Sequence, residues 1–114
     1  MEKLDRKIYE SVPGKQVTMS HVIANPDKRV LDKLGFTDKP FSAMGIMTIT
    51  PGEAAIIAVD IAKKAGDVEI GFVDRFSGSV VILGDISNVR NACEAANHYL
   101  SRQLGFTVSK ITTT

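Results

Sequence analysis

Residues 71–85, GFVDRFSGSVVILGD, hold two apolar segments on either side of a short polar tip. The second segment, VVIL at 80–83, is unbroken, and the tip contains Ser-Gly, which supplies the backbone freedom of a tight turn. Short apolar runs bounded by such turn residues are typical of paired antiparallel strands. The stretch therefore predicts a β-hairpin with strands over 67–73 and 79–84.

The residues before this hairpin predict a long helix. In TPGE (50–53), Thr50 can accept a hydrogen bond from the Glu53 amide, Glu53 can reach back to the Thr50 amide, and proline suits the first turn. The apolar pattern then runs to about Ala65, and Gly66 is a typical helix stop.

This helix is apolar nearly all round. In residues 53–62, EAAIIAVDIA, only Glu53 and Asp60 are polar. A helix that covers one face of a small sheet needs a single apolar stripe, so this one is expected to be buried on more than one side. Self-association is the simplest explanation.

The elements around the hairpin predict an α/β (α+β) fold of the ferredoxin-like type. SAMGIMTIT (42–50) is a mostly apolar strand, and Asp85 or Ser87 caps a second long helix that ends at Gly105. Residues 106–112 predict a last strand. From the first of these strands onward the order is β-α-β-β-α-β, which forms one antiparallel sheet with two helices on one face.

A further strand and a short helix precede this unit. The alternation in residues 16–24, QVTMSHVIA, predicts a strand that has three apolar residues on one side: Val17, Met19 and Ile23. With Asn25 as the N-cap and Pro26 as the first helical residue, a short helix is predicted over 27–34, with Gly35 as the stop.

Composition excludes several classes of protein. The 114 residues fit one domain, and the formal net charge of +1 argues against a nucleic-acid partner. No apolar run reaches the roughly 20 residues of a membrane span, and the N-terminal residues lack the apolar core of a signal peptide. We therefore expect a cytoplasmic protein with no nucleic-acid or membrane partner.

Reactive residues do not form a convincing site. No phosphate-binding or nucleophile motif is present, and a triad of Ser20, His21 and Asp60 would use residue types that any chain of this length contains. We expect His21 to be a structural histidine, and Cys93 to be a packing thiol in the apolar stripe of its helix. No catalytic residue, metal ligand or cofactor is predicted.

The hairpin tip has two interpretations at this point. It can be only a polar turn, in which Ser77 and Gly78 supply the freedom to turn. If the domain is a subunit of a ring, however, symmetry repeats every tip, and several tips can line one central opening.

Four stretches resemble the bacterial microcompartment shell domain in its circularly permuted form, as found in ethanolamine- and propanediol-utilisation shell proteins. They are VPGKQVT (12–18), HVIANP (21–26), GIMTITPGEA (45–54) and DVEIGFVDRFSGSVVILGD (67–85). The resemblance implies a homohexameric tile without catalytic activity. It also implies packing with other shell proteins into a cytoplasmic compartment shell around enzymes.

The resemblance also implies roles for residues of the tip and of the first long helix. Four tip residues match the pore-facing loop of the family: Arg75, Phe76, Ser77 and Gly78. Lys63 matches the edge lysine at which neighbouring hexamers meet, and Lys64 is the alternative one position on.

The permuted form implies an N-terminal extension over 1–14 before a permuted domain over 15–114. RKIYESV (6–12) fits a short strand, and six copies are expected to close a parallel barrel over the pore. The residues assigned to this barrel are Ile8, Tyr9, Glu10, Ser11 and Val12. HVIANP resembles the strand that closes an ordinary shell domain, but residues 106–112 can also take that place.

Two other functions compete with a shell tile. A ferredoxin-like oligomeric regulatory protein that binds small molecules would need a long mobile loop and a basic phosphate site, and the sequence shows neither. A small enzyme would need a cluster of reactive polar residues, which the sequence also lacks. The sequence thus favours the structural tile.

Overall fold

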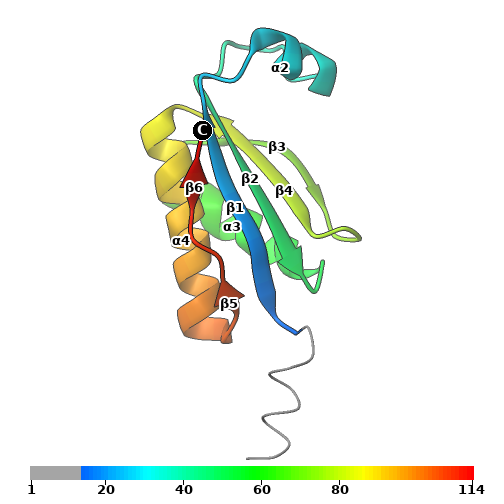
Figure 1. The fold of residues 1–114 in the computed structure, drawn as a ribbon, viewed down its shortest axis with the longest axis vertical. Helices are drawn as coiled ribbons and strands as arrows, with labels where there is room; N and C mark the ends of the chain where they lie inside the picture. The colour runs from blue at the N-terminus through cyan, green and yellow to red at the C-terminus, as the bar shows by residue number, and fades with distance from the viewer. Residues whose placement is uncertain (1–13) are drawn as a thin grey trace, which may run out of the picture.

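A computed structural model describes residues 14–114 (Figure 1). The pore-capping strand predicted over 6–12 lies outside these residues. The elements in order are β1 (Gln16–Ala24), α2 (Lys28–Leu34), β2 (Ala43–Thr50), α3 (Ala54–Ala65), β3 (Glu69–Asp74), β4 (Ser79–Gly84), α4 (Ile86–Leu104), β5 (Thr107–Val108) and β6 (Thr112–Thr113).

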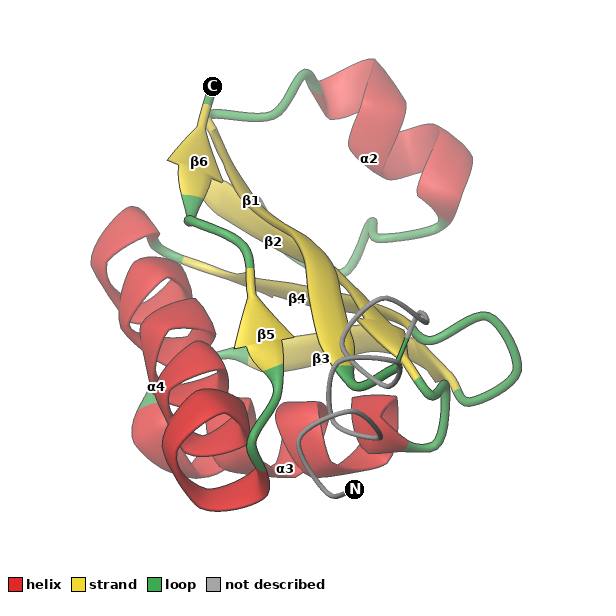
Figure 2. Ribbon diagram, turned by 60° about the horizontal axis from the view of Figure 1, so that its bottom comes forward, coloured by secondary structure: helices red, strands yellow, loops and turns green. Residues whose placement is uncertain are grey.

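One sheet organises the fold, with its strands in the order β3-β4-β2-β1-β5 and with β6 also paired to β1. The pairs β3–β4, β4–β2 and β2–β1 are antiparallel, whereas β5 and β6 run parallel to β1. Helices α3 and α4 cover one face, and α2 lies on the other side of the sheet (Figure 2). The hairpin, both long helices and the mixed α/β architecture are confirmed.

The closing position next to β2 belongs to β1. Residues Gln16 to Ala24 pair antiparallel with Thr50 to Ala43 along the whole strand. The segment predicted as a single last strand instead forms the two short strands β5 and β6 outside β1. The structure therefore decides between the two segments that fit the closing position: β1, from the front of the chain, occupies it.

Helix α4 packs closely on the sheet. Its stripe of Val89, Ala92, Cys93, Ala96 and Leu100 is fully buried, which confirms the packing position predicted for Cys93. Close packing depends on a glycine in β2, because a β-carbon on Gly45 would lie 2.9 Å from the Cγ1 atoms of both Ile82 and Val89. A second apolar cluster, on the opposite face of the sheet, contains Leu31 from α2.

The predicted faces of β1 are wrong because of a β-bulge between Val17 and Met19. Val17 faces the helices and is 2% exposed, while Met19 is 41% exposed, and Ser20 and Val22 are the next buried residues. An additional residue in one strand reverses the alternation of side chains beyond it. A pattern of strict alternation therefore assigned Met19 to the wrong side.

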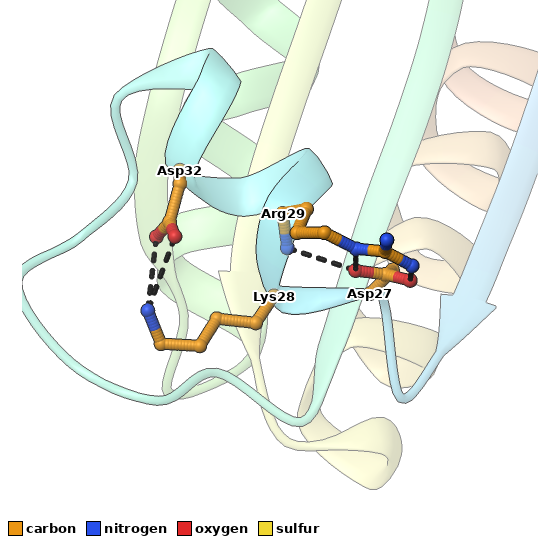
Figure 3. Close-up of polar contacts among 4 residues, drawn as sticks. All are labelled: Asp27, Lys28, Arg29 and Asp32. Atoms are coloured by element: carbon orange, nitrogen blue, oxygen red, sulfur yellow. Dashed lines mark hydrogen bonds and ion pairs between the residues drawn. The ribbon is translucent and has the colours of Figure 1, made fainter.

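Two helix starts also differ from the prediction. Thr50 is the last residue of β2, and Glu53 occupies the N-cap position of α3 without a side-chain cap hydrogen bond. The intervening turn is closed by the backbone, with the Ala54 amide donating to the Pro51 oxygen at 2.9 Å. In α2 the cap is Asp27 rather than Asn25, because the Asp27 carboxylate accepts from the Arg29 amide at 2.8 Å (Figure 3).

The remaining caps agree with the sequence. The Asp85 carboxylate accepts from the Asn88 amide at 2.8 Å at the start of α4. Gly35 and Gly105 end α2 and α4 in the left-handed conformation that glycine adopts without strain. No helix within residues 14–114 is both long and apolar enough to cross a lipid bilayer.

Candidate assembly site

The hairpin tip between β3 and β4 is held by the carboxylate of Asp74. This carboxylate accepts hydrogen bonds from the Phe76 amide and from the Ser77 hydroxyl, both at 2.9 Å. The hydrogen bond from the Phe76 amide has the larger effect and the one from the Ser77 hydroxyl the next, and they hold the pKa of Asp74 below its usual range. The charged carboxylate therefore stabilises one conformation of the turn.

The base of the tip contacts the end of β2. The Ile49 amide donates to the Gly78 oxygen at 2.9 Å. A β-carbon on Gly78, whose φ is +77°, would lie 1.9 Å from the Ile49 oxygen. The base of the tip is therefore fixed to Ile49 of β2, and no side chain larger than hydrogen fits at Gly78.

The end of the tip projects from the chain. Phe76 is 85% exposed, which is the largest exposure of any large apolar side chain in residues 14–114. The Arg75 guanidinium lies 5.0 Å from the centre of the Phe76 ring, within the range of a cation–π contact. An aromatic ring and a cation are thus presented together.

Apolar side chains continue from the tip along β3 and α3. Six of the eleven exposed large apolar side chains in the described chain belong to these elements, and we call them the α3–β3 surface: Ile56, Ile57, Ile70, Phe72, Val73 and Phe76. Three of them, Ile56, Val73 and Phe76, line a shallow hollow of about 300 Å³. Exposed apolar patches of this kind are typical of interaction sites.

Strand β3 adds an open backbone edge to this surface. It is the outermost strand on its side of the sheet as far as the chain is described. Its apolar residues lie on both of its faces, since Val73 pairs with the core residue Val80 and Phe72 pairs with Val81 of the second cluster. The signal in the sequence for such an edge strand is a pair of adjacent apolar residues, Phe72 and Val73, whose side chains point to opposite faces.

The predicted edge lysines lie at the far end of α3 from the tip. The Lys63 ammonium donates to the Val68 backbone oxygen at 2.6 Å. The Lys64 ammonium pairs with Asp60 at 2.7 Å, and this hydrogen bond raises the pKa of Lys64. Both lysines are exposed. The lysines lie in the last turn of α3, whereas the tip lies beside Ile56 near its start, so most of the helix separates the two.

His21, Cys93 and His98 occupy structural or solvated positions. The ring nitrogens Nδ1 and Nε2 of His21 lie 2.5 Å from the Thr112 hydroxyl and 2.9 Å from the Thr114 hydroxyl. Burial raises the pKa of the Cys93 thiol to about 11, and His98 is exposed. No group of three potential metal-ligating side chains occurs among residues 14–114. His21 thus links β1 to β6.

One sheet, two helices on one of its faces and the exposed apolar side chains of the α3–β3 surface characterise this domain. The sequence model of the BMC domain matches residues 43–113. The chain therefore belongs to the BMC domain family, as its sequence predicted.

Named relatives of this chain are shell proteins of bacterial microcompartments. It is 56% identical over 110 residues to the shell protein PduU of Salmonella typhimurium, covering 96% of this chain and 94% of PduU. It is 50% identical over 108 residues to the shell protein EutS of the same organism, covering 95% and 96%. A solved structure, the CutR flat hexamer, matches with a TM-score of 0.85 and 45% identity, covering 90% of this chain and 94% of that one.

Proposed function

We propose that this protein is a non-enzymatic tile of a bacterial microcompartment shell that assembles as a homohexamer. The exposed α3–β3 surface carries this proposal, because a single chain leaves these apolar side chains in water. The flat hexamer of the relative CutR supports the stoichiometry. The reported relatives are shell proteins, so they do not support a regulatory protein of ferredoxin-like fold.

The tip is the proposed rim of a central pore. Arg75, Phe76, Ser77 and Gly78 project from one end of the hairpin, and the open edge of β3 lies beside them. In a ring with a six-fold axis, six such tips can converge on one opening. Residues 1–14 are proposed as an extension whose Ile8 to Val12 strands close a barrel over this opening.

The far end of α3 is the proposed contact between neighbouring hexamers. Lys63 is already held by a backbone oxygen of its own chain, whereas the partner of Lys64 is the exposed carboxylate of Asp60. An exposed ion pair contributes little to stability, so Lys64 can turn to a new partner more easily than Lys63. We therefore favour Lys64 for this contact, with Lys63 as the alternative.

The names of the relatives suggest the setting of the tile. PduU and EutS match over nearly the whole chain, which supports a shell of the propanediol- or ethanolamine-utilisation type. Other shell proteins are the proposed partners along the hexamer edges, and encapsulated enzymes are proposed partners at its faces. The proposed location is the compartment shell in the bacterial cytoplasm.

Electron cryo-microscopy of the purified full chain tests this function. We expect rings of six chains, with the tip of every hairpin at the central axis and α3 between neighbouring chains. A ring with the tips on its outer perimeter would contradict the proposed pore. A stable monomer would contradict the tile itself.

A further inference from the structure

A cavity of about 570 Å³ lies between α2 and the segment that leads from α2 to β2. Its apolar lining consists of Pro26, Leu31, Phe36, Pro40 and Phe41. Pockets that bind small molecules usually have volumes of roughly 300–1,000 Å³ and mainly apolar walls with a few polar groups. The volume and the lining of this α2 cavity match that description.

The wall of the α2 cavity is anchored at both ends. The Asn25 amide donates to the Ser42 oxygen at 2.8 Å, and this hydrogen bond joins the two ends of the segment that connects β1 to β2. The ring of Phe36 is seated over β3, where a β-carbon on Gly71 would lie 2.7 Å from the Phe36 Cζ atom. A cavity formed in advance binds without a large cost of ordering its walls.

Both cations of the cavity lining are already paired. Lys28 lies 3.1 Å from Asp32 (Figure 3), and Lys39 pairs with Glu69 of β3. The hydrogen bond to Glu69 raises the pKa of Lys39, and the nearby Asp38 adds to this effect. An anion entering the cavity would therefore have to compete with carboxylates that already hold both lining cations.

We propose that the α2 cavity binds a small uncharged molecule with an apolar body and few hydrogen-bonding groups. The apolar walls favour burial of such a body, and Thr37 is the uncharged polar side chain of the lining. Helix α2, which forms one wall of the cavity, lies on the other side of the sheet from α3 and α4 (Figure 2), and the opposite wall reaches β3 through Phe36 and Lys39.

Calorimetric titration of the full chain with 2-naphthol and 2-naphthoate tests this proposal. The two probes share one ring system, and only 2-naphthoate is an anion at neutral pH. We expect about one 2-naphthol per chain and at least about tenfold weaker binding of 2-naphthoate, because an anion must displace a paired carboxylate. No saturable binding of 2-naphthol, or equal binding of both probes, would overturn the proposal.

Two variants locate the binding in the cavity. Thr37→Trp places a large ring in it from an exposed wall residue and should weaken 2-naphthol binding at least about tenfold. The matched control Thr107→Trp, on exposed β5 at the other end of the sheet (Figure 1), should leave binding unchanged. Unchanged binding in folded Thr37→Trp protein, checked by circular dichroism, would overturn the proposed site.

A third variant tests the charge argument by a gain of binding. Glu69→Gln removes the carboxylate that holds Lys39 and leaves the lining of the cavity intact. We expect 2-naphthoate to bind at least about threefold more tightly to this variant than to the parent protein. The affinity for 2-naphthol should stay the same. If 2-naphthoate binding does not rise, paired charge is not what excludes anions.

Discussion

A β-carbon on Gly52 would lie 2.1 Å from the backbone oxygen of Arg75. The turn before α3 and the hairpin tip are therefore in direct backbone contact, although more than 20 residues separate them in the sequence. This contact fixes the direction in which the tip leaves the chain. It also places the exposed Phe76 beside the start of α3, where Ile56 begins the apolar helix surface.

Gly52→Ala should therefore move the tip and destabilise the fold. Because the clashing atom belongs to the backbone, the neighbour cannot move away cheaply, and we expect a loss of roughly 1–3 kcal/mol in the free energy of unfolding. Chemical denaturation followed by circular dichroism measures it. Gly45→Ala is the control, because a β-carbon at Gly45 also lies close to its neighbours but does not contact the tip. If Gly52→Ala is as stable as the parent protein, the close approach does not hold the tip.

Cys93 should make stability fall at alkaline pH. Its pKa is raised from 9.0 to about 11 by burial. Between these values the unfolded chain loses the thiol proton and the folded chain keeps it, so its contribution is complete below about pH 9 and is lost as the pH rises toward 11. The loss should be on the order of 2 kcal/mol.

Denaturation of the parent protein and of Cys93→Ala at pH 8, 9, 10 and 11 measures this contribution. The variant loses some packing at every pH, but its stability should fall less steeply across the alkaline range. Parallel curves for the two proteins would show that Cys93 does not titrate differently in the folded and unfolded chains.

The edge lysines can be told apart by their effects on assembly. Lys64→Ala should weaken the growth of two-dimensional sheets of hexamers more than Lys63→Ala does, because Lys63 is held by the Val68 oxygen of its own chain. Negative-stain electron microscopy shows the sheets, and sedimentation checks that the hexamers persist. A larger defect in Lys63→Ala would assign the contact to Lys63.

We expect the fold to survive removal of the proposed N-terminal extension. The sheet and the helices that cover it lie within residues 14–114, so a chain lacking residues 1–11 should fold and assemble. We expect the truncation to uncover the proposed pore, because the proposed barrel would satisfy the unpaired edges of six strands in a closed ring over it. Structures of the two proteins decide this. Residues 6–12 far from the axis in the full-length hexamer would contradict the barrel.

Local signals in the sequence predicted most elements correctly. Gly35 and Gly105 end their helices where the periodicity ends, and the Asp85 cap is a contact between near neighbours. The errors arose where distant residues decide. The bulge at Val17 depends on how β1 aligns with β2, and two segments with similar patterns competed for the position beside β2. The contact of Gly52 with Arg75 likewise has no local signature.

Sedimentation of three proteins tests whether the α3–β3 surface holds six chains together. The parent chain should sediment with the mass of six 12.3 kDa chains. Ile56→Asp places a charge at a residue that is 50% exposed on this surface and should dissociate the hexamer, because a buried unpaired carboxylate is costly. Val30→Asp, at a residue 47% exposed on α2, should remain hexameric. A monomeric parent chain, or a hexamer that survives in Ile56→Asp, would contradict the account.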